Sequence, residues 1–577
     1  MSRRRLWVVG LVLIAGALTV VARSVQIALI EGYEWSARAD RQQQQEISVP
    51  GPRGTIRTAD GYVLATSVDR VAIQADTRLL SDPELFAQAA APLLGIDGDE
   101  LVGRLVDGPR AVWLAKQVAP EVGEAVRELA PTAVALVPDF ERVYPLGTVA
   151  APVVGFVGRE ELRMVGREGL EHHFDETLAG EPQTFLAVND AIQRKVRLER
   201  VERGQDGCDI ELAIHARLQA VCETELGRAL DELHADAASA VILDPRTGAV
   251  LALASMPSFD PAAFAEVPQE RWRLRPVQDA IEPGSTVKPF VAAAALAAGV
   301  VRPGERFDCR DRGIRLAGFW IRDHVEPGRY TLDEVVAHSA NTGIIEVAER
   351  IEPEQLYRAF DAFGFGRRTG VNYPAEASGL MPGVETWSKL SRASFAIGQE
   401  LTVTPLQVAL AYAVIANGGW LPEPCLVTSV SGREWSMPSD RSYRARVLDG
   451  SLAARLRAML EAVVVEGTGD GARVPGLRVA GKTGTAQRAV NGGFDDRHHV
   501  AWFAGFLPLP DPRLVIVVAL ENPKTDFWAS TAAAPVFARI ADAAAAHLDL
   551  PRDGGEPTAV RVAHAAPAET GTGGGGA

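Results

Sequence analysis

The chain has 577 residues, a length that suggests about three or four domains rather than a single core. Hydrophobic residues make up 47% of it and charged residues 23%, which is typical of a globular protein and excludes a chain that is disordered throughout. The formal net charge of −15 argues against a nucleic-acid partner, because phosphate binding needs a basic surface.

The first predicted element is a membrane-spanning helix within residues 1–30. Residues 6–22 form an uncharged apolar run, short but long enough to span a bilayer. Arg3, Arg4 and Arg5 precede this run and predict a cytoplasmic N-terminus, with the rest of the chain outside the cytoplasm. The alternative is a cleaved signal peptide, since residues 20–22 end with small side chains. The apolar run is longer than a usual signal core, which favours an uncleaved anchor.

Residues 31–205 are predicted to form a second region, and they contain no motif that is typical of a catalytic site. A polar, glutamine-rich stretch is followed by short strands such as residues 71–76 and by acidic helical stretches such as residues 83–94. The interpretation is a mixed α/β domain.

Residues 206–551 have a different pattern. Two apolar runs around Asp-Pro-Arg-Thr-Gly predict a β-hairpin over residues 239–255. Further strands are predicted at 477–488, 498–508 and 513–522. Helical stretches are predicted between these strand groups, at 286–300, 332–351, 405–419 and 451–464. Strands at both ends of a helical middle suggest one sheet closed by the two ends, with helices against it. The low-complexity segment 552–577 is predicted to be disordered.

Three short motifs fall in this last region. They are Ser285-Thr-Val-Lys288, Ser339-Ala-Asn341 and Lys482-Thr-Gly-Thr485. The first follows a Pro-Gly turn at a predicted helix start, where serine is also a common cap, so that motif alone does not separate a cap from a nucleophile. The order of all three in one domain favours the nucleophile and is typical of penicillin-binding proteins and class A β-lactamases.

The side chains of these motifs suit acyl transfer. Ser285 and Lys288 share a helix face, so a neutral lysine can take the serine proton, and the helix N-terminus favours negative charge on the serine oxygen. Lys288 is neutral only if burial or a nearby cation lowers its pKa, and Lys482 is the predicted cation. Ser339 can relay a proton between the lysines and the leaving amine.

The remaining motif positions suit substrate binding. Asn341 can orient Lys288 and hydrogen-bond a substrate amide. Gly484 leaves the strand edge open for a substrate to lie along it. The backbone N–H groups of Ser285 and Thr485 are then predicted to form an oxyanion hole.

Lysine is rare in this chain, which makes its positions informative. There are only six lysines, so arginine serves at most basic positions. Arginine cannot be deprotonated in proteins and therefore cannot act as a base. Two of the six, Lys288 and Lys482, fall in the motifs, which argues against a chance match.

With these residues in place, the sequence resembles the class B penicillin-binding proteins over nearly its whole length. RGTIRTADGYVLA (residues 53–65) and GREGLEHHFDETLAG (166–180) resemble the N-terminal signatures of that family. The stretches EPGSTVKPF, HSANTG, GQELTVTPLQVALAYAVIANGG and VAGKTGTAQ resemble its transpeptidase motifs, and the last two are closer to the septal, cell-division type than to the elongation type.

The resemblance implies a fold and a place in the cell. The fold is α+β and multidomain, with a single-pass anchor, an elongated mixed α/β pedestal domain of dimerisation type, and a C-terminal antiparallel sheet flanked by helices as in serine β-lactamases. The bulk of the chain is expected outside the inner membrane, in the periplasm. A membrane glycan polymerase and division proteins are the expected partners.

The resemblance also implies a reaction. Ser285 attacks the carbonyl between the last two D-alanines of a peptidoglycan stem peptide, D-alanine leaves, and the amine of a neighbouring stem takes the acyl group. β-Lactams are expected to acylate Ser285 in the same way. Thr483, Gly484 and Thr485, with Lys482, are expected to bind the substrate and its terminal carboxylate. No metal or cofactor is implied, and the four widely spaced cysteines predict no metal site either.

Two positions depart from the family pattern. Thr58-Ala59 stands where the N-terminal signature usually has Asp-Arg, and Glu400 stands where a glycine is common. The first leaves the contacts of the pedestal in question. The second leaves in question a loop near the catalytic cleft. Neither touches the three motifs.

Two rival functions stay open. A serine hydrolase of the same fold, either a β-lactamase or a D,D-carboxypeptidase, shares the first step but uses water as acceptor. Glu376 lies roughly where a hydrolytic β-lactamase has its deacylating glutamate, although a surface-loop carboxylate is the favoured interpretation. A non-catalytic division scaffold or β-lactam sensor is the other rival, and it would need none of the motif side chains.

Overall fold

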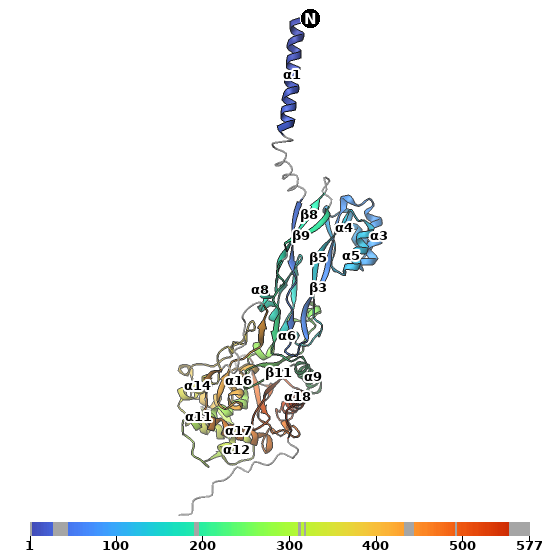
Figure 1. The fold of residues 1–577 in the computed structure, drawn as a ribbon. Helices are drawn as coiled ribbons and strands as arrows, with labels where there is room; N and C mark the ends of the chain where they lie inside the picture. Colours follow the sequence, from blue (N-terminus) through green and yellow to red (C-terminus); the bar gives the residue numbers. More distant parts are fainter. Residues whose placement is uncertain are drawn as a thin grey trace, which may run out of the picture.

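The structure is a computed structural model that describes residues 3–26, 44–189, 195–202, 204–309, 313–316, 319–431, 443–490 and 493–552. Figure 1 shows a slender part built largely of strands joined to a broader part in which helices surround a sheet. Residues 27–30 of the predicted anchor segment and residues 553–577 of the predicted tail lie outside the described residues.

Helix α1 (Arg3–Val25) contains the predicted apolar run. Within the described residues it is the one helix long and apolar enough to cross a membrane, with a mean hydropathy of 2.2 over Trp7–Val25. Its large apolar side chains are exposed, Trp7 by 76% and Leu13 by 68%. An exposed apolar surface of this length suits lipid rather than water, as the sequence predicts.

The N-terminal part is a mixed α/β domain, as predicted. Strands β1 (Gln44–Gly51), β8 (Gly180–Asn189) and β9 (Lys195–Glu202) form one antiparallel sheet. A second sheet is built on the long strand β3 (Val63–Asp76), which pairs with β4 (Ala111–Val118) and β5 (Val134–Val143). Helices α3 (Pro83–Leu94), α4 (Gly98–Val106) and α5 (Pro120–Leu129) share a small core with the end of β3.

The second sheet does not stop at the predicted boundary between residues 205 and 206. The short strand β2 (Ile56–Arg57) pairs with β3 on one side and, in parallel, with β10 (Ile210–Leu212) on the other. Strand β10 then pairs with β18 (Val427–Val430), which belongs to the C-terminal part of the chain. The two parts therefore share a continuous hydrogen-bonded backbone.

The C-terminal sheet is antiparallel and closed by the two ends of its domain, which confirms the predicted fold. Its order is β12 (Val250–Met256), β11 (Ala237–Leu243), β22 (Leu514–Glu521), β21 (Gly493–Leu507) and β20 (Ala480–Val490). Among the strands that the structure describes, β20 lies at the edge and pairs with β21 alone.

Helices cover both faces of this sheet, which explains why every residue of β11 is buried. Because side chains alternate along a strand, Ala240 and Ile242 pack with α9 (Ala216–Leu233) and α18 (Ala533–His547). Val241 and Leu243 point the other way, into the core that α11 (Lys288–Ala297) and α16 (Pro405–Ala416) help to build. Helix α17 (Gly450–Val465) packs beside β20.

The predicted helical run 332–351 is wrong as a single element. It is two helices, α12 (Leu332–Ala337) and α13 (Asn341–Ala348), because Ser339 adopts a φ of 62° in the left-handed region. A non-glycine residue there cannot continue a right-handed helix. The break puts the Ser339-Ala-Asn341 motif in a bend.

The other elements are short. They are α6 (Ala151–Val154), β6 (Val157–Glu160), β7 (Arg163–Gly166), α7 (Gly169–His173), α8 (Asp175–Leu178), α10 (Arg275–Gln278), β13 (Arg306–Cys309), β14 (Ile314–Leu316), β15 (Phe319–Ile321), β16 (Gly328–Thr331), α14 (Pro353–Ala362), α15 (Ser391–Ala396), β17 (Trp420–Pro422) and β19 (Tyr443–Arg446).

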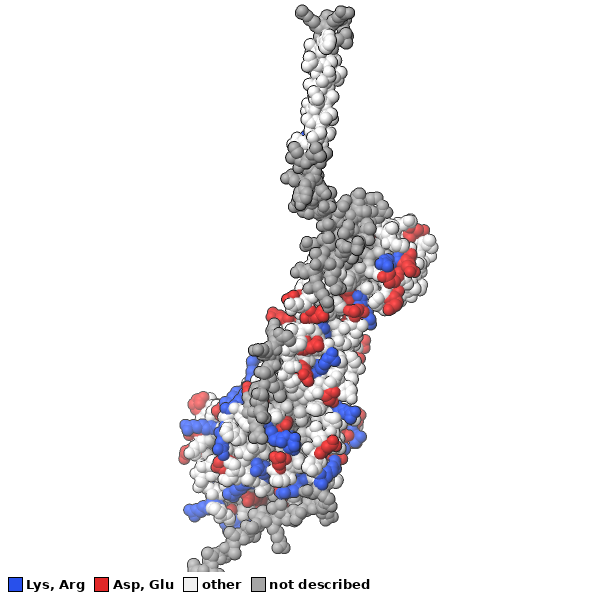
Figure 2. Space-filling model, viewed as in Figure 1, with Lys and Arg blue, Asp and Glu red and all other residues white. Residues whose placement is uncertain are grey.

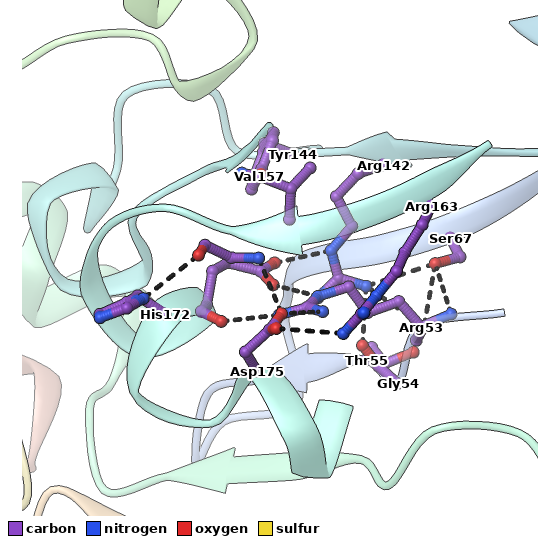
Figure 3. A network of polar contacts seen from close by, with 12 residues as sticks. Arg53, Gly54, Thr55, Ser67, Arg142, Tyr144, Val157, Arg163, His172 and Asp175 are labelled. Atoms are coloured by element: carbon purple, nitrogen blue, oxygen red, sulfur yellow. Dashed lines mark hydrogen bonds and ion pairs between the residues drawn. The ribbon is translucent and has the colours of Figure 1, made fainter. Parts of the chain in front are cut away.

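A buried ionic network joins the two N-terminal sequence signatures (Figure 3). Arg53, from the first, donates to Glu171 at 2.5 Å and to Asp175 at 2.6 Å, both from the second. Arg142 of β5 donates to the other oxygen of Glu171 at 2.7 Å. The side chains of Arg53, Arg142 and Glu171 are 1% exposed or less, so the network links three segments inside the pedestal.

Acidic and basic side chains are interspersed on the face of the C-terminal part seen in Figure 2. Neither sign gathers over a single element on that face.

Candidate active site

Ser285 lies in a tight turn pressed against the edge strand β20. The turn is the short 3-10 helix η5 (Gly284–Val287), and the α-helix α11 begins only at Lys288. Gly284 has a φ of 54°. A Cβ on Gly484 of β20 would come 2.7 Å from the carbonyl oxygen of Pro283 and from Cγ2 of Thr286. Only a glycine lets the strand approach the turn so closely.

The turn is braced by hydrogen bonds, and its serine is not used as a cap. Neither η5 nor α11 has a side-chain cap. The Tyr412 hydroxyl donates to the Thr286 carbonyl at 2.8 Å, and the Trp502 indole donates to the Glu282 carbonyl at 3.1 Å. Ser285 is half-buried. Its hydroxyl is therefore held at a surface that a ligand can reach.

Lys288 is fully buried beneath this surface. Its Nζ donates to Asn341 Oδ1 at 2.8 Å, to the Ser339 carbonyl at 2.5 Å and to Ser339 Oγ at 3.2 Å. Burial lowers the pKa of Lys288 to about 7, although the negative charge of Asp323 opposes this. Near neutral pH a large share of this amine is thus unprotonated and able to accept a proton.

The predicted pairing of Ser285 with Lys288 is not a formed hydrogen bond. None of the hydrogen bonds of the described residues joins the Ser285 hydroxyl to Lys288, whose amine donates to the Ser339-Ala-Asn341 motif instead. Catalytic hydrogen bonds are often long until a substrate is bound.

Lys482 is also fully buried, on β20. Its Nζ donates to Thr483 Oγ1 at 3.1 Å, to the Thr483 carbonyl at 3.2 Å and to Thr468 Oγ1 at 3.4 Å. Burial and, less strongly, the charge of Lys288 lower the pKa of Lys482 well below its ordinary range. The sequence predicts that Lys482 is the cation that lowers the pKa of Lys288, but burial is the cause of that lowering, and the charge effect between the two lysines acts on Lys482.

The threonines of the third motif are tied to neighbouring segments. Thr483 Oγ1 shares a 2.6 Å hydrogen bond with Thr468 Oγ1. Thr485 Oγ1 accepts a hydrogen bond from the backbone N–H of Ala529 at 3.2 Å. The outer edge of β20 has no strand partner in the described part of the chain, so an extended peptide can lie along it.

Sequence reasoning missed Asp323, which fixes the second motif. It accepts hydrogen bonds from the backbone N–H of Thr342 at 3.0 Å, from the backbone N–H of Asn341 and from the Thr342 hydroxyl. Asn341 Nδ2 also donates to the carbonyl of Arg322 at 2.9 Å. A carboxylate at the start of α13 is favourable, because the first N–H groups of a helix lack partners. No spacing in the sequence connects Asp323 to this helix.

The structure shows where the two departures from the family pattern, Thr58-Ala59 and Glu400, lie. Thr58 is buried, and the backbone N–H of Ala59 donates to the carbonyl of Ile214 at 2.9 Å, so this turn contacts the C-terminal part. Glu400 has a φ of 60°, where glycine is favoured. Its loop contacts the serine turn, since the Gly284 N–H donates to the carbonyl of Gly398 at 3.2 Å.

Glu376 is not the surface-loop carboxylate that was expected. It is only 8% exposed, and its oxygens accept from the N–H and hydroxyl of Thr369 at 2.5 Å and from the N–H of Gly370 at 3.0 Å. These hydrogen bonds hold a loop, and they explain the burial of the carboxylate.

Comparisons with known proteins give a consistent result. The family model described as the penicillin binding protein transpeptidase domain matches residues 238–542, and that of the penicillin-binding protein dimerisation domain matches residues 48–212. The peptidoglycan D,D-transpeptidase FtsI of Escherichia coli (strain K12) is 34% identical over 516 residues, which are 88% of this chain and 85% of the relative. Stage V sporulation protein D of Bacillus subtilis (strain 168) is 30% identical over 556 residues, 93% of this chain and 85% of the relative.

A solved structure is similar over most of its length. The crystal structure of penicillin-binding protein 3 from Mycobacterium tuberculosis, complexed with aztreonam, aligns with a TM-score of 0.66 and 27% identity. The alignment covers 88% of this chain and 98% of that one.

Proposed function

The chain belongs to the penicillin-binding protein transpeptidases and is a peptidoglycan D,D-transpeptidase, and on this premise we propose that Ser285 is its acylated nucleophile and Lys288 its base. The observation that carries the assignment is the state of Lys288. This lysine is fully buried three residues after Ser285, and its pKa is lowered to about 7. A buried amine that can lose its proton, three residues after a half-buried serine, suits general-base activation of that serine.

In the proposed first half-reaction, neutral Lys288 takes the hydroxyl proton of Ser285 as the serine oxygen attacks the carbonyl carbon between two D-alanines. The resulting oxyanion is stabilised by the backbone N–H groups of Ser285 and Thr485. The C–N bond then breaks, and D-alanine leaves after its amine takes a proton through Ser339. An ester on Ser285 remains.

In the second half-reaction, the amine of a neighbouring stem peptide attacks this ester. The new amide bond forms the cross-link, and the Ser285 oxygen recovers its proton through the lysines and Ser339. We propose that Thr483, Gly484 and Thr485, with Lys482, bind the donor peptide and its terminal carboxylate along β20. Asn341 would hydrogen-bond a substrate amide, and its contact with Lys288 at 2.8 Å supports an additional role in orienting the base.

We further propose that the chain works in septal wall synthesis, which its similarity to FtsI supports. The apolar α1 would anchor it in the inner membrane, with the three arginines in the cytoplasm and the bulk of the chain in the periplasm. Its partners would be a membrane glycan polymerase and division proteins. We propose residues 1–30 as anchor, 31–205 as pedestal, 206–551 as transpeptidase domain and 552–577 as tail.

The test is intact mass spectrometry of the full chain in detergent after exposure to benzylpenicillin, beside Ser285→Ala. The expected result is a stable adduct of one drug molecule that the variant lacks. An adduct that disappears quickly while the drug is hydrolysed would show a β-lactamase instead. A folded wild-type chain without any adduct would contradict the nucleophile assignment and favour a scaffold.

A further inference from the structure

Three potential metal ligands from distant parts of the chain meet where the pedestal joins the C-terminal part. They are Asp60, His215 and His547. Asp60 lies in the turn between β2 and β3, His215 comes just before α9, and His547 is the last residue of α18. One ligand atom from each side chain lies within 4.8 Å of the others, and all three residues are half-buried.

Only one of the two carboxylate oxygens of Asp60 accepts a hydrogen bond from the described residues. Its Oδ1 accepts a hydrogen bond from the backbone N–H of Ala216 at 2.9 Å, and so caps the start of α9. Its Oδ2 is buried and, among the described residues, has no hydrogen-bond partner. A buried anionic oxygen without a partner is costly, and such an atom calls for an explanation such as a bound ion.

The two histidines lie close to the carboxylate of Asp60 and to each other. The ring centroids of His215 and His547 are 5.9 Å apart, with the rings at 80° to each other. Neither ring forms a hydrogen bond or an ion pair within the described residues, so their nitrogens remain open to a ligand.

The spacing suits a small tetrahedral ion after minor adjustment. Bonds of about 2.0–2.1 Å place tetrahedral ligand atoms roughly 3.3 Å apart. Three atoms at the present spread would each move inward by about 1 Å or less, which side-chain rotation provides. Two imidazoles and one carboxylate form a donor set that suits Zn²⁺, whereas Ca²⁺ and Mg²⁺ prefer oxygen ligands alone.

We propose that Asp60, His215 and His547 bind one Zn²⁺ ion, with water completing the coordination. No local spacing indicates this site, because the three ligands lie far apart along the chain. The ion would be structural, since it would join a turn of the pedestal to the start of α9 and the end of α18. It would thus tie the pedestal to the helices behind the transpeptidase sheet. This site is separate from the acylation chemistry proposed above.

The experiment uses the full chain in detergent, without a polyhistidine tag and stripped of metal with a chelator. Zn²⁺ affinity is measured by competition with a chromophoric chelator. Asp60→Asn keeps an oxygen to cap α9 but removes the anionic ligand, and His547→Ala removes an imidazole at a position where alanine suits the helix. The control is His234→Asn at the opposite end of α9, an exposed residue in the left-handed conformation that asparagine tolerates.

The wild-type chain and His234→Asn should bind one Zn²⁺ per chain with equal affinity. Loss of an outer partner of a ligand typically weakens metal binding by about 10–100-fold, so loss of a ligand should weaken it at least as much. Zn²⁺ should also raise the unfolding temperature of the wild-type chain but not of His547→Ala. Unchanged affinity in His547→Ala, or no binding by the wild-type chain, would overturn the proposal. Acylation by benzylpenicillin should persist in all variants.

Discussion

The pedestal and the C-terminal part each bury basic side chains, and the pKa values of these side chains shift in opposite directions. In the pedestal, burial alone would lower the pKa of Arg53, but the carboxylates of Glu171 and Asp175 raise it above its ordinary value. In the active site, burial lowers the pKa of Lys288 and Lys482, and neither donates a hydrogen bond to a carboxylate within the described residues.

Burying a charged side chain costs free energy, and the two parts of the molecule use such burial for different purposes. A buried charge with opposite partners stays charged and locks segments together. A buried amine without such a partner gives up its proton and becomes a base. The type of residue follows this division, since arginine stays charged and lysine can lose its proton. Each prediction below changes one side of this comparison.

The largest effect is expected at Lys288. Lys288→Arg keeps a cationic side chain but removes the group that can lose a proton. General-base catalysis contributes about 10²–10⁴-fold, so the rate of acylation by benzylpenicillin should fall by that factor. The rate is measured by stopped flow or with a fluorescent penicillin. Lys389→Arg, at an exposed lysine, should leave the rate unchanged; a similar loss there, or none at Lys288, would contradict the assignment.

The matching change in the pedestal is Glu171→Gln. It leaves the buried guanidinium of Arg53 with the carboxylate of Asp175 alone, and removes the carboxylate that pairs with the buried guanidinium of Arg142. Removing one partner of a buried ionic network costs about 3–5 kcal/mol of unfolding free energy. Denaturant unfolding measures this loss, while the folded fraction should still acylate. Glu160→Gln breaks an exposed pair with Arg167 and should cost less than about 1 kcal/mol.

A smaller effect on the rate is expected at Asp323. Asp323→Asn removes the charge that holds the start of α13, and a hydrogen bond to a charged group contributes about 1.5–3 kcal/mol. Because Asn341 contacts Lys288, a looser α13 should lower the acylation rate roughly tenfold without abolishing it. The negative charge of Asp323 opposes the lowering of the pKa of Lys288. Removing this charge should therefore shift the midpoint of the pH profile of acylation to lower pH. An unshifted midpoint would count against a positioning role for Asp323.

The pH dependence tests the same base without any substitution, and within about one pH unit of the midpoint the expected change is small. Burial lowers the pKa of Lys288 to about 7, so this amine gains a proton as the pH falls below that value and can no longer act as a base. The acylation rate should rise with pH to a plateau above neutrality and fall by about tenfold per pH unit below the midpoint. A profile that is flat between pH 5 and 9 would show that another group is the base.

Local patterns in the sequence predicted the frame of the site but not its fine geometry. The hairpin follows from two apolar runs around Asp-Pro-Arg-Thr-Gly, a pattern that neighbouring residues alone determine. The break at Ser339 does not, because a serine at a left-handed φ is imposed by its surroundings rather than by its own preference. Asp323 and Glu376 were missed or misplaced because their partners are loop and helix-start N–H groups, which leave no pattern of side-chain types.

Strand β3, 14 residues long, pairs with β2, and β2 pairs with β10 at the start of the C-terminal part. A hydrogen-bonded sheet rather than a single-chain linker therefore joins the two parts. At about 3.3 Å per residue the strand is roughly 45 Å long. A flexible linker would let Ser285 move relative to the pedestal, whereas strands paired across the junction hold it at one position.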